Sequence, residues 1–379
     1  MSRVDKIIQT LDIEKNCLGI YSQNKFYFKN QTEALQNSNM AWRHSKILGD
    51  DKDWLFINLL LRDQDLLKYS TNPILMKSIS NALEAQKKAA LTAKIDFSKL
   101  CFYDIIPDHL LAKWFSLREK AMIQVLSKVE KPKDYDILHK IHVVVSNISK
   151  QNIKVGQSSE RILYDMFSSA TGRLTTSRGS YPILNISKDE RGTIRPNNDM
   201  FLELDLNGAE IRTLLSLSGQ KQPDYDIHEF NKDKCFPKLS RKEVKAKFFA
   251  WLYNPNAVDY KLQKLYDKDI YRKYYDDGKI TTPFDRKLEV DERRALNYLL
   301  QSTTSDIVLE NTYKITKMLE GKKSNVAFTM HDSVVLDFAK EDHILVKKIK
   351  EQFENNMFGS FVSTVNIGKN FGNLKEISI

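Results

Sequence analysis

Cysteine is scarce in this 379-residue chain, which has only three, at positions 17, 101 and 235. Their number is odd, they lie far apart, and no two of them form a CxxC pair. This pattern argues against both a disulfide framework and a structural zinc site. No apolar run approaches the roughly 18 residues that span a membrane, and the first residues are charged or polar instead of forming the apolar region of a signal peptide. We therefore expect a cytoplasmic protein with no membrane partner.

The composition is that of a globular protein with a basic surplus. Hydrophobic residues make up 41% and aromatic residues 10% of the chain, which is ordinary for a folded domain and excludes a disordered one. The length allows two or three subdomains. The net charge of +10 comes from 59 basic and 49 acidic residues. A basic surplus favours polyanionic partners, but by itself it does not distinguish nucleic-acid binding from other functions.

Local patterns predict strands and helices in both halves of the chain. A β-hairpin is predicted at 17–29, and a loop-rich segment at 171–187, where Ser, Thr, Gly and Pro cluster. Helices are predicted at 54–67, 73–94, 108–126, 136–152, 209–218, 241–253 and 292–320. A strand is predicted at 201–205 and a strand–turn–strand at 325–338. Strands and helices alternate in the second half, which indicates an α+β core.

Two acidic residues stand at the ends of predicted strands. Asp205 follows a hydrophobic strand and precedes a helix, so a rigid strand could present its carboxylate to a Mg²⁺ ion. Asp332 lies in a His-Asp-Ser turn between two β-rich runs. Each has a structural alternative, because Asp205 could cap the following helix and Asp332 could simply form the turn.

The segment between these two residues carries cations and aromatics at helical spacing. Ser240 and Glu243 form a capping box that opens a helix. Within it, four residues recur at every fourth position: Arg241, Lys245, Phe249 and Tyr253. The cations could hold a triphosphate and the aromatics could stack on a base. The alternative is a solvated basic face beside a core aromatic patch.

The order of the three segments favours the chemical interpretation. Phosphoryl transfer from a nucleoside triphosphate uses two divalent ions roughly 3.5–4 Å apart, which two carboxylates from separate strands can hold. A basic helix between these carboxylates in sequence would supply the triphosphate contacts. The order carboxylate, basic helix, carboxylate is therefore what this reaction requires.

These segments resemble the three polymerase motifs of the family A DNA polymerases, the bacterial DNA polymerase I type. The first motif, D-Y-S-Q-I-E-L-R, is matched by Asp205, Glu210, Ile211 and Arg212. The second, R-x3-K-x3-F-x3-Y, is matched at all four positions of the helix, and the third, an H-D-E hairpin, by His331 and Asp332.

Shorter segments extend the resemblance over about residues 171–379. Thr171-Gly-Arg173 and Leu184-Asn185-Ile186 are similar to the family's T-G-R-L-S-S and L-Q-N-I segments. Asp226-Ile227-His228 matches a D-I-H before the second motif. The long helix before the third motif is matched by Arg293, Asn297, Gln301 and Asp306.

The resemblance implies a role for each matched residue. Asp205, Leu206 and Asp332 would bind two Mg²⁺ ions, with Mn²⁺ as a candidate substitute, and Lys245 would be the general acid for pyrophosphate. The implied nucleotide-binding residues are Arg241, Lys245, Phe249, Tyr253, Glu210 and His228, with Glu210 excluding a ribose 2′-OH. The implied DNA-binding residues are Arg173, Asn185, Arg293, Asn297, Gln301 and His331.

The chain also departs from the family pattern. Asn207-Gly208-Ala209 replaces S-Q-I in the first motif, Ala250 and Asn254 replace two glycines of the second, and Ser333 replaces the glutamate of the third. These changes put fidelity and closure of the helix in question but leave the implied metal ligands in place. Asp12-Ile13-Glu14 has the D-x-E form of an exonuclease motif, but about 95 residues are too few for the usual exonuclease domain, so no proofreading is expected.

The resemblance implies an α+β right-hand polymerase with a small N-terminal α/β module. Residues 1–95 would form this module, 96–170 the thumb, 171–230 and 291–379 the palm, and 231–290 the fingers. The expected partners are primer–template DNA and dNTPs, with a separate exonuclease, helicase or processivity factor as further candidates. A small chain without an exonuclease suggests a phage or mobile-element enzyme acting in the host cytoplasm. An RNA polymerase or primase-like enzyme and a catalytically inactive nucleic-acid-binding scaffold are the alternatives.

Overall fold

The computed structural model describes residues 9–13, 16–22, 25–27, 61, 65–95, 106–130, 132–177, 179–254 and 256–379. The chain divides into two compact units, Met1–Tyr135 and Asp136–Ile379. This boundary falls inside the segment 96–170 that is predicted to be the thumb. Within the described ranges, no helix is both long and apolar enough to cross a membrane.

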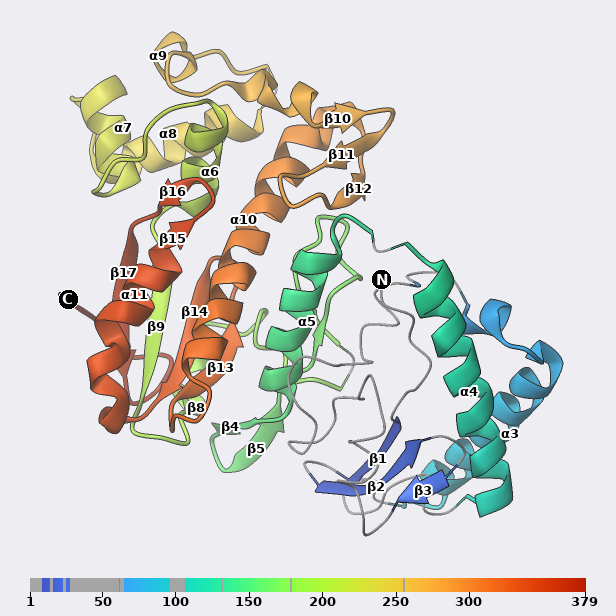
Figure 1. Ribbon diagram of the computed structural model, residues 1–379. Coiled ribbons are helices and arrows are strands. Elements are labelled where there is room, and N and C mark those ends of the chain that lie inside the picture. Colours follow the sequence, from blue (N-terminus) through green and yellow to red (C-terminus); the bar gives the residue numbers. More distant parts are fainter. Residues whose placement is uncertain are drawn as a thin grey trace. The chain divides into compact units, whose positions relative to one another are not determined.

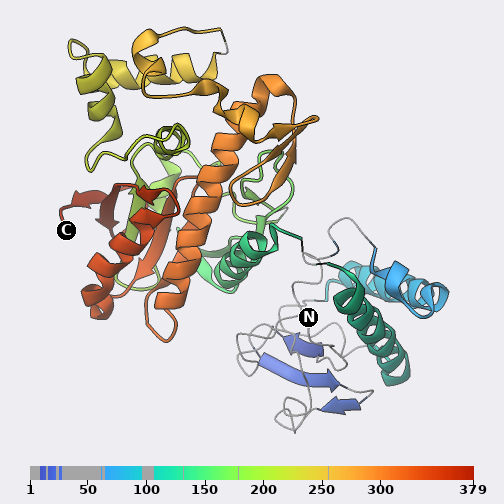
Figure 2. The same ribbon diagram turned by 45° about the horizontal axis from the view of Figure 1, so that its top comes forward.

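The first unit contains a small sheet and two long helices (Figures 1 and 2). Strands β1 (Gln9–Ile13), β2 (Asn16–Ser22) and β3 (Lys25–Tyr27) pair antiparallel in that order, so the predicted hairpin is confirmed as far as it is described. Helices α3 (Pro73–Thr92) and α4 (Asp108–Lys128) pack against each other after the short η2 (Leu66–Tyr69). The predicted helix at 54–67 lies largely outside the described residues, as does part of the Asp12-Ile13-Glu14 motif.

Sequence signals explain where α3 begins, and apolar side chains join it to α4 and the sheet. The Asn72 side chain accepts a hydrogen bond from the Leu75 N–H at 3.0 Å, and a proline occupies the first turn of α3, both of which favour a helix start. Apolar side chains from the sheet and both helices form one core, including Tyr21, Ile79, Leu83 and Phe115. The predicted helices at 73–94 and 108–126 are therefore confirmed, whereas their packing against each other was not predicted.

The second unit is built on a five-stranded antiparallel sheet of order β13-β14-β9-β17-β18. Its strands are β9 (Met200–Leu206), β13 (Asn325–Thr329), β14 (Ser333–Phe338), β17 (Ser363–Gly368) and β18 (Lys375–Ile377). The central strand β9 pairs with β14 so that Asp205 lies opposite Ser333, and with β17 so that Asp205 lies opposite Thr364. The sheet thus joins the two segments that are predicted to form one palm.

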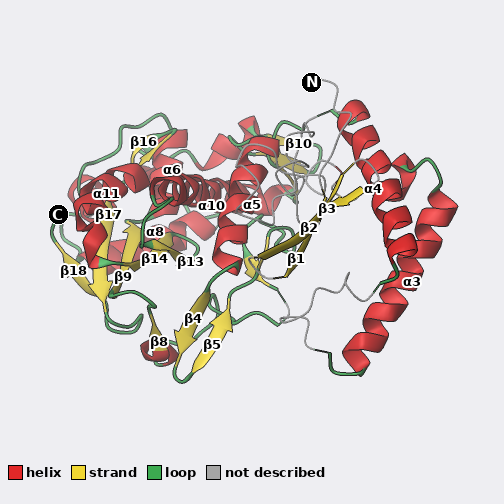
Figure 3. Ribbon diagram, turned by 60° about the horizontal axis from the view of Figure 1, so that its bottom comes forward, coloured by secondary structure: helices red, strands yellow, loops and turns green. Residues whose placement is uncertain are grey.

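Helices form a layer over this sheet (Figure 3). The 27-residue α10 (Glu292–Met318) contacts β13 and β14, and α11 (Val346–Glu354) contacts β9, β17 and α10. The Asp291 side chain caps α10 by accepting from the Arg294 N–H at 3.1 Å. Helix α5 (Tyr135–Ser149) lies in the same unit, where Lys140 forms an ion pair with Glu310 of α10.

A cluster of helices packs beyond the end of β9 that carries Asp205 (Figure 1). It consists of α6 (Ala209–Leu217), α7 (Ile227–Cys235), α8 (Arg241–Tyr253) and α9 (Tyr260–Gln263). Their shared core includes Leu214, Ile227, Phe248 and Trp251. Gly208, at φ +60°, makes the turn from β9 into α6, and a Cβ there would lie 2.5 Å from Ile227 Cγ2. Only glycine fits both this backbone conformation and this contact.

The remaining elements are short. A three-stranded sheet of β10, β11 and β12 packs beside the first half of α10. The short strands are β4 (Asn152–Val155), β5 (Ser158–Arg161), β6 (Tyr164–Asp165), β7 (Thr175–Thr176), β8 (Ile194–Arg195), β10 (Tyr275–Asp276), β11 (Lys279–Thr281), β12 (Lys287–Glu289), β15 (Asn355–Asn356) and β16 (Gly359–Ser360). The 3-10 turns are η4 (Glu190–Thr193), η5 (Lys268–Lys273) and η6 (Lys340–Leu345). The predicted α+β class is confirmed.

Candidate active site

The two predicted metal-binding carboxylates lie at the same end of the sheet. Asp205 is the second-last residue of β9, and Asp332 directly precedes β14, the strand that pairs with it. The Leu206 N–H donates to the Asp332 carbonyl at 3.2 Å, which ties the two backbone segments together. The Leu206 side chain is a buried hydrocarbon without donor atoms, so only its backbone carbonyl could bind a metal ion.

The structure removes one of the two structural alternatives for this pair. Helix α6 has Gly208 as its N-cap and no side-chain capping hydrogen bond, so Asp205 does not cap it. Asp332 does lie in a tight turn, closed by a hydrogen bond from the Met330 N–H to the Ser333 carbonyl at 2.9 Å. A turn-forming role and a metal-binding role are compatible for Asp332, because only its side chain is needed for a metal.

The electrostatics of the pair are those of crowded acids. Burial, repulsion by Asp332 and repulsion by Glu203 raise the pKa of Asp205 to about 7, and Lys245 opposes this shift. Glu203 lies two residues before Asp205 on the same face of β9, and it accepts from Asn366 Nδ2 at 2.9 Å. Burial is also the main cause that raises the pKa of Glu203. A bound cation would relieve this repulsion.

Helix α8 exposes one stripe and buries another. Its capping box is present: the Ser240 N–H donates to Glu243 Oε2 at 2.8 Å, and the Ser240 hydroxyl accepts from the Glu243 N–H. The buried stripe consists of Val244, Phe248, Trp251 and Leu252. The predicted stripe at Arg241, Lys245, Phe249 and Tyr253 is a different one, in which only Phe249 is partly buried. The core aromatics of α8 therefore lie on another face, so the stripe's aromatics are available for contacts.

The aromatic half of the exposed stripe is ordered by stacking. The Phe249 and Tyr253 rings are stacked, with centroids 5.8 Å apart and an interplanar angle of 11°. His228 of α7 lies beside Phe249, with a centroid distance of 6.3 Å. The His228 side chain is 2% exposed, and burial lowers its pKa to about 4. His228 is therefore neutral at physiological pH.

Glu210 joins three segments of the site. It accepts from Arg173 Nη2 and from the Tyr253 hydroxyl. Burial and the bond to Glu210 raise the pKa of Tyr253, so the phenol stays protonated and acts as the donor. The structure thus brings the first motif, the segment around Arg173 and the end of the α8 stripe into direct contact.

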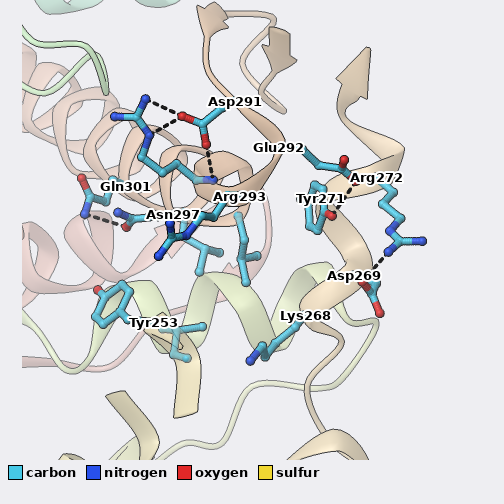
Figure 4. A pocket seen from close by; sticks show the side chains of 14 residues that line it. Tyr253, Lys268, Asp269, Tyr271, Arg272, Asp291, Glu292, Arg293, Asn297 and Gln301 are labelled. Carbon is cyan, nitrogen blue, oxygen red and sulfur yellow. Dashed lines mark hydrogen bonds and ion pairs between the residues drawn. The ribbon is translucent and has the colours of Figure 1, made fainter. Parts of the chain in front are cut away.

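A cavity of about 1200 Å³ opens beside the end of α8. Its lining includes Tyr253 together with Arg293, Asn297 and Gln301 from successive turns of α10, and the Gln301 amide donates to Asn297 Oδ1 at 2.7 Å (Figure 4). Four residues predicted to contact nucleotide or DNA therefore share one cavity. The other charged residues at its wall are Lys268, Arg272 and Arg294 together with the acids Asp269, Asp291 and Glu292, and Arg272 and Arg294 form ion pairs with Asp269 and Asp291.

A buried ion pair supports the segment that carries Arg173. Arg286 is paired with Asp306 of α10 at 2.7 Å and also donates to the Gly172 carbonyl at 3.0 Å. Gly172 has φ +72°, and a Cβ there would lie 2.6 Å from Arg286 Nη2. Breaking such a buried pair is costly, so Arg173 is attached to a rigid anchor.

Arg241 at the start of the stripe is held by Asp226. The guanidinium donates to the Asp226 carboxylate from Nε at 3.1 Å and from Nη2 at 2.6 Å. Burial favours the protonated form of Asp226, but the bonds from Arg241, the Glu229 backbone and Asn207 outweigh it and keep the pKa of Asp226 well below its usual range. Asp226 is therefore ionised.

Two predicted residues take no part in these side-chain hydrogen bonds. Asn185 is exposed in a turn, where its N–H donates to the Pro182 carbonyl at 2.9 Å, and it does not line the cavity. His331 is exposed next to Asp332. Within the described part of the chain, no three His, Cys, Asp or Glu side chains are arranged as a metal cage, so any metal would have to be held by the carboxylate pair, backbone and substrate oxygens.

Sequence reasoning did not single out Glu203, Asp226 or Arg286 as site residues. The alternation of β9 could have placed Glu203 on the face of Asp205. Asp226 was matched only as part of a motif, and its pairing with Arg241 depends on how α7 and α8 pack. Nothing in the local sequence around Arg286 indicates its partner, because Asp306 lies 20 residues away on another element.

The fold and site together define a protein with a carboxylate pair at a sheet end, a neighbouring cation–aromatic helix and a large cavity lined in part by charged residues. Among known proteins, the chain is 37% identical over 101 residues to the DNA polymerase of Bacillus phage SP01. The aligned region covers 23% of this chain and 11% of that polymerase. This relative confirms the resemblance to DNA polymerases that the motifs predict.

A solved structure, the POL domain of Pol1 from M. smegmatis in complex with DNA primer-template and dNTP, is also similar. It has a TM-score of 0.46 and 15% sequence identity, over 81% of this chain and 66% of that chain. No protein-family model matches the sequence. The match to the phage polymerase covers only a small part, 11%, of that protein's length.

Proposed function

We propose that the chain is a template-directed DNA polymerase that extends a primer 5′ to 3′ with dNTPs by two-metal-ion nucleotidyl transfer. The observation that carries this proposal is the contact of Glu210 with Tyr253. Glu210 follows Asp205 by five residues and Tyr253 ends the α8 stripe, so this contact supports a single site that contains both the carboxylate pair and the stripe. The proposed context is phage or mobile-element DNA replication, without proofreading.

The carboxylate pair fits divalent cations. Two acids at neighbouring strand ends form a hard oxygen donor set. Burial and acidic neighbours raise the pKa of Asp205 to about 7 although Lys245 opposes the shift, so a divalent cation would relieve repulsion that Lys245 does not remove. Asp205, Asp332 and the Leu206 carbonyl would hold the ions, Mg²⁺ or in its place Mn²⁺. When bound, the ions would stabilise negative charge on the reacting phosphate and lower the pKa of the primer 3′-OH.

The chain's own side chains would position the nucleotide. Arg241 and Lys245 would bind the triphosphate through charge-assisted hydrogen bonds, and Lys245 would also donate a proton to the leaving pyrophosphate. Phe249 and Tyr253 would pack against the nascent base pair, next to His228. Glu210, held by Arg173 and Tyr253, would fill the space that a ribose 2′-OH needs.

The cavity residues would bind the nucleic acid. Arg293 would contact phosphate, while Asn297 and Gln301, which are joined by a hydrogen bond, would contact the primer–template. Arg173 would lie at the nascent pair because Glu210 holds it there. His331, next to Asp332, and Asn185 are further candidate DNA contacts.

A primer-extension assay tests the proposal. Asp205→Ala and Asp332→Ala should each lower extension about 1000-fold or more, because the ions cannot be held and the charge on the reacting phosphate is not stabilised. Binding of a labelled primer–template should stay within about twofold of wild type. Asp224→Ala, at an exposed carboxylate, is the matched control and should extend normally.

Substantial synthesis by either variant would refute the metal assignment. Offering rNTPs alongside dNTPs distinguishes a DNA polymerase from an RNA polymerase or primase-like enzyme. A 3′-mismatched primer in the same assay tests whether any editing takes place. Binding of primer–template without extension in wild type would favour the inactive scaffold.

A further inference from the structure

Asp226 is the most densely hydrogen-bonded carboxylate near the proposed site. Its Oδ1 accepts from the backbone N–H of His228 at 2.8 Å and of Glu229 at 2.9 Å, which caps α7. The same oxygen accepts from Arg241 Nε, and Oδ2 accepts from Arg241 Nη2 and from Asn207 Nδ2, the latter at 2.6 Å. Capping alone would use only the two backbone bonds.

The hydrogen bonds between Arg241 and Asp226 occupy one edge of the guanidinium and leave the other edge free to bind an anion. The Nε–Nη2 edge faces Asp226, whereas Nη1 has no hydrogen-bond partner within the described part of the chain. The Arg241 side chain is 46% exposed. A guanidinium has two edges that can each bind an oxyanion in a bidentate manner. Holding one edge fixes the plane of the group and presents the Nη1 edge.

The Asp226 carboxylate is in turn positioned by Asn207 and Arg212. Asn207 donates to Asp226 and accepts, at its Oδ1, from the Ile227 N–H at 2.8 Å and from Arg212 Nη2 at 3.2 Å. Arg212 is fully buried and also donates to the backbone carbonyls of Asn207, Pro223 and Tyr225. The chain of contacts runs from Arg212 through Asn207 and Asp226 to Arg241, and its outer end is the only exposed one.

The charges along this chain of contacts leave a net attraction for anions. Asp226 is ionised and lies between two guanidinium groups, Arg212 and Arg241, both of which interact with it. The set therefore carries one net positive charge. Asp226 orients Arg241 without cancelling its attraction for phosphate, because Arg212 compensates the carboxylate.

We propose that Asp226 is a positioning residue that orients Arg241 toward the triphosphate of the incoming nucleotide, with Asn207 and Arg212 fixing Asp226 in turn. The proposal rests on the triphosphate-binding role proposed for Arg241. Orientation before binding removes the rotamer freedom that a long side chain otherwise loses on binding. Asp226 acts through Arg241 and does not touch the nucleotide itself.

The test measures binding of inorganic tripolyphosphate and of a dNTP by calorimetry, to the full chain in EDTA so that no metal contributes. Asp226→Asn keeps Oδ1 for capping α7 but places an NH₂ group against Arg241 Nη2. Asp226→Ser, also a good N-cap, removes the carboxylate without this clash. Both should weaken binding of both probes about tenfold, and neither should weaken binding further when Arg241→Ala is already present.

Unchanged or tighter binding in Asp226→Asn and Asp226→Ser would overturn the proposal, since it would mean that Asp226 is neutral toward the anion or competes with it. An equal loss with and without Arg241 would also overturn it. Melting temperatures of the three single and two double variants show whether α7 stays folded, and Asp226→Ser serves if Asp226→Asn unfolds. Arg241-dependent binding of tripolyphosphate by a wild-type chain that extends no primer would refute the proposed function but not this inference.

Discussion

At the scale of single residues, Glu210 has the most specific surroundings in the proposed site. Its two oxygens are taken by Arg173 and Tyr253, so the carboxylate cannot rotate away from a ribose that approaches it. Glu210→Ala should therefore open room for a 2′-OH and raise the use of rNTPs relative to dNTPs by about 10- to 100-fold. Primer extension with each nucleotide type, compared as kcat/KM, measures this ratio.

Tyr253→Phe is the matched control for Glu210→Ala. It removes the same hydrogen bond but keeps the carboxylate and the ring that stacks on Phe249. Sugar selectivity should remain within a few-fold of wild type in this variant. Equal relaxation of selectivity in Tyr253→Phe and Glu210→Ala would mean that the hydrogen bond matters and the carboxylate does not exclude the hydroxyl.

The sequence predicted these single residues only where a motif contained them. Glu210 and Tyr253 were both singled out, but their direct contact was not, since it depends on how the turn at Gly208 aims α6 at the end of α8. Asp226 belongs to a short motif in the sequence. Its hydrogen bonds with Arg241 could not be predicted, because they depend on how α7 packs against α8. Long-range partners of this kind leave no trace in local spacing.

At the scale of elements, α7 places a buried, neutral histidine, His228, beside Phe249 of α8. Burial is the main cause that lowers the pKa of His228 to about 4; Asp226 opposes this shift, and the nearby cations Arg241 and Lys245 add to it. The unfolded chain has a histidine pKa of about 6.5. Between these values the unfolded state binds more protons than the folded state, so stability falls as the pH drops through this window.

The loss can be measured by urea unfolding at two pH values. Between pH 7 and pH 5, wild type should lose about 1–2 kcal/mol more of its unfolding free energy than His228→Asn does. His343→Asn, which changes an exposed imidazole at η6, should lose as much as wild type. An unchanged pH dependence in His228→Asn would show that His228 is not the group that titrates.

The elements themselves were predicted well where local chemistry determines their ends. The capping box of Ser240 and Glu243 gave α8 the bounds that the structure has, and the helix of α10 ends two residues before its predicted end. The order of strands in the sheet was not predicted, because β9, β14 and β17 are brought together from distant segments by register and burial. The boundary between the two compact units at Tyr135 was likewise not predicted, because the sequences of α4 and α5 have similar amphipathic patterns.

At the scale of the whole molecule, charge links the composition to the proposed partner. The surplus of ten positive charges, together with Arg293 in the cavity, predicts binding of primer–template that is strongly weakened by salt. With about five phosphates neutralised, affinity should fall roughly 10²- to 10³-fold between 50 and 200 mM salt. A nearly flat salt dependence would contradict binding through the phosphate backbone.

Arg293 in the cavity allows the contribution of one phosphate contact to be separated from the effect of net charge on the salt dependence. Arg293→Ala should remove one phosphate contact and reduce the slope of log affinity against log salt by about 1, while weakening all sequences alike. Fluorescence anisotropy of a labelled primer–template over a salt series measures the slope.

Lys323→Ala is the control variant. It removes an exposed cation that is paired with Glu341 and that lies just before β13, at the end of the sheet away from Asp205. Because both variants lose the same charge, a slope that changes in both would mean that net charge alone binds the DNA, whereas a change confined to Arg293→Ala would locate the nucleic acid in the cavity.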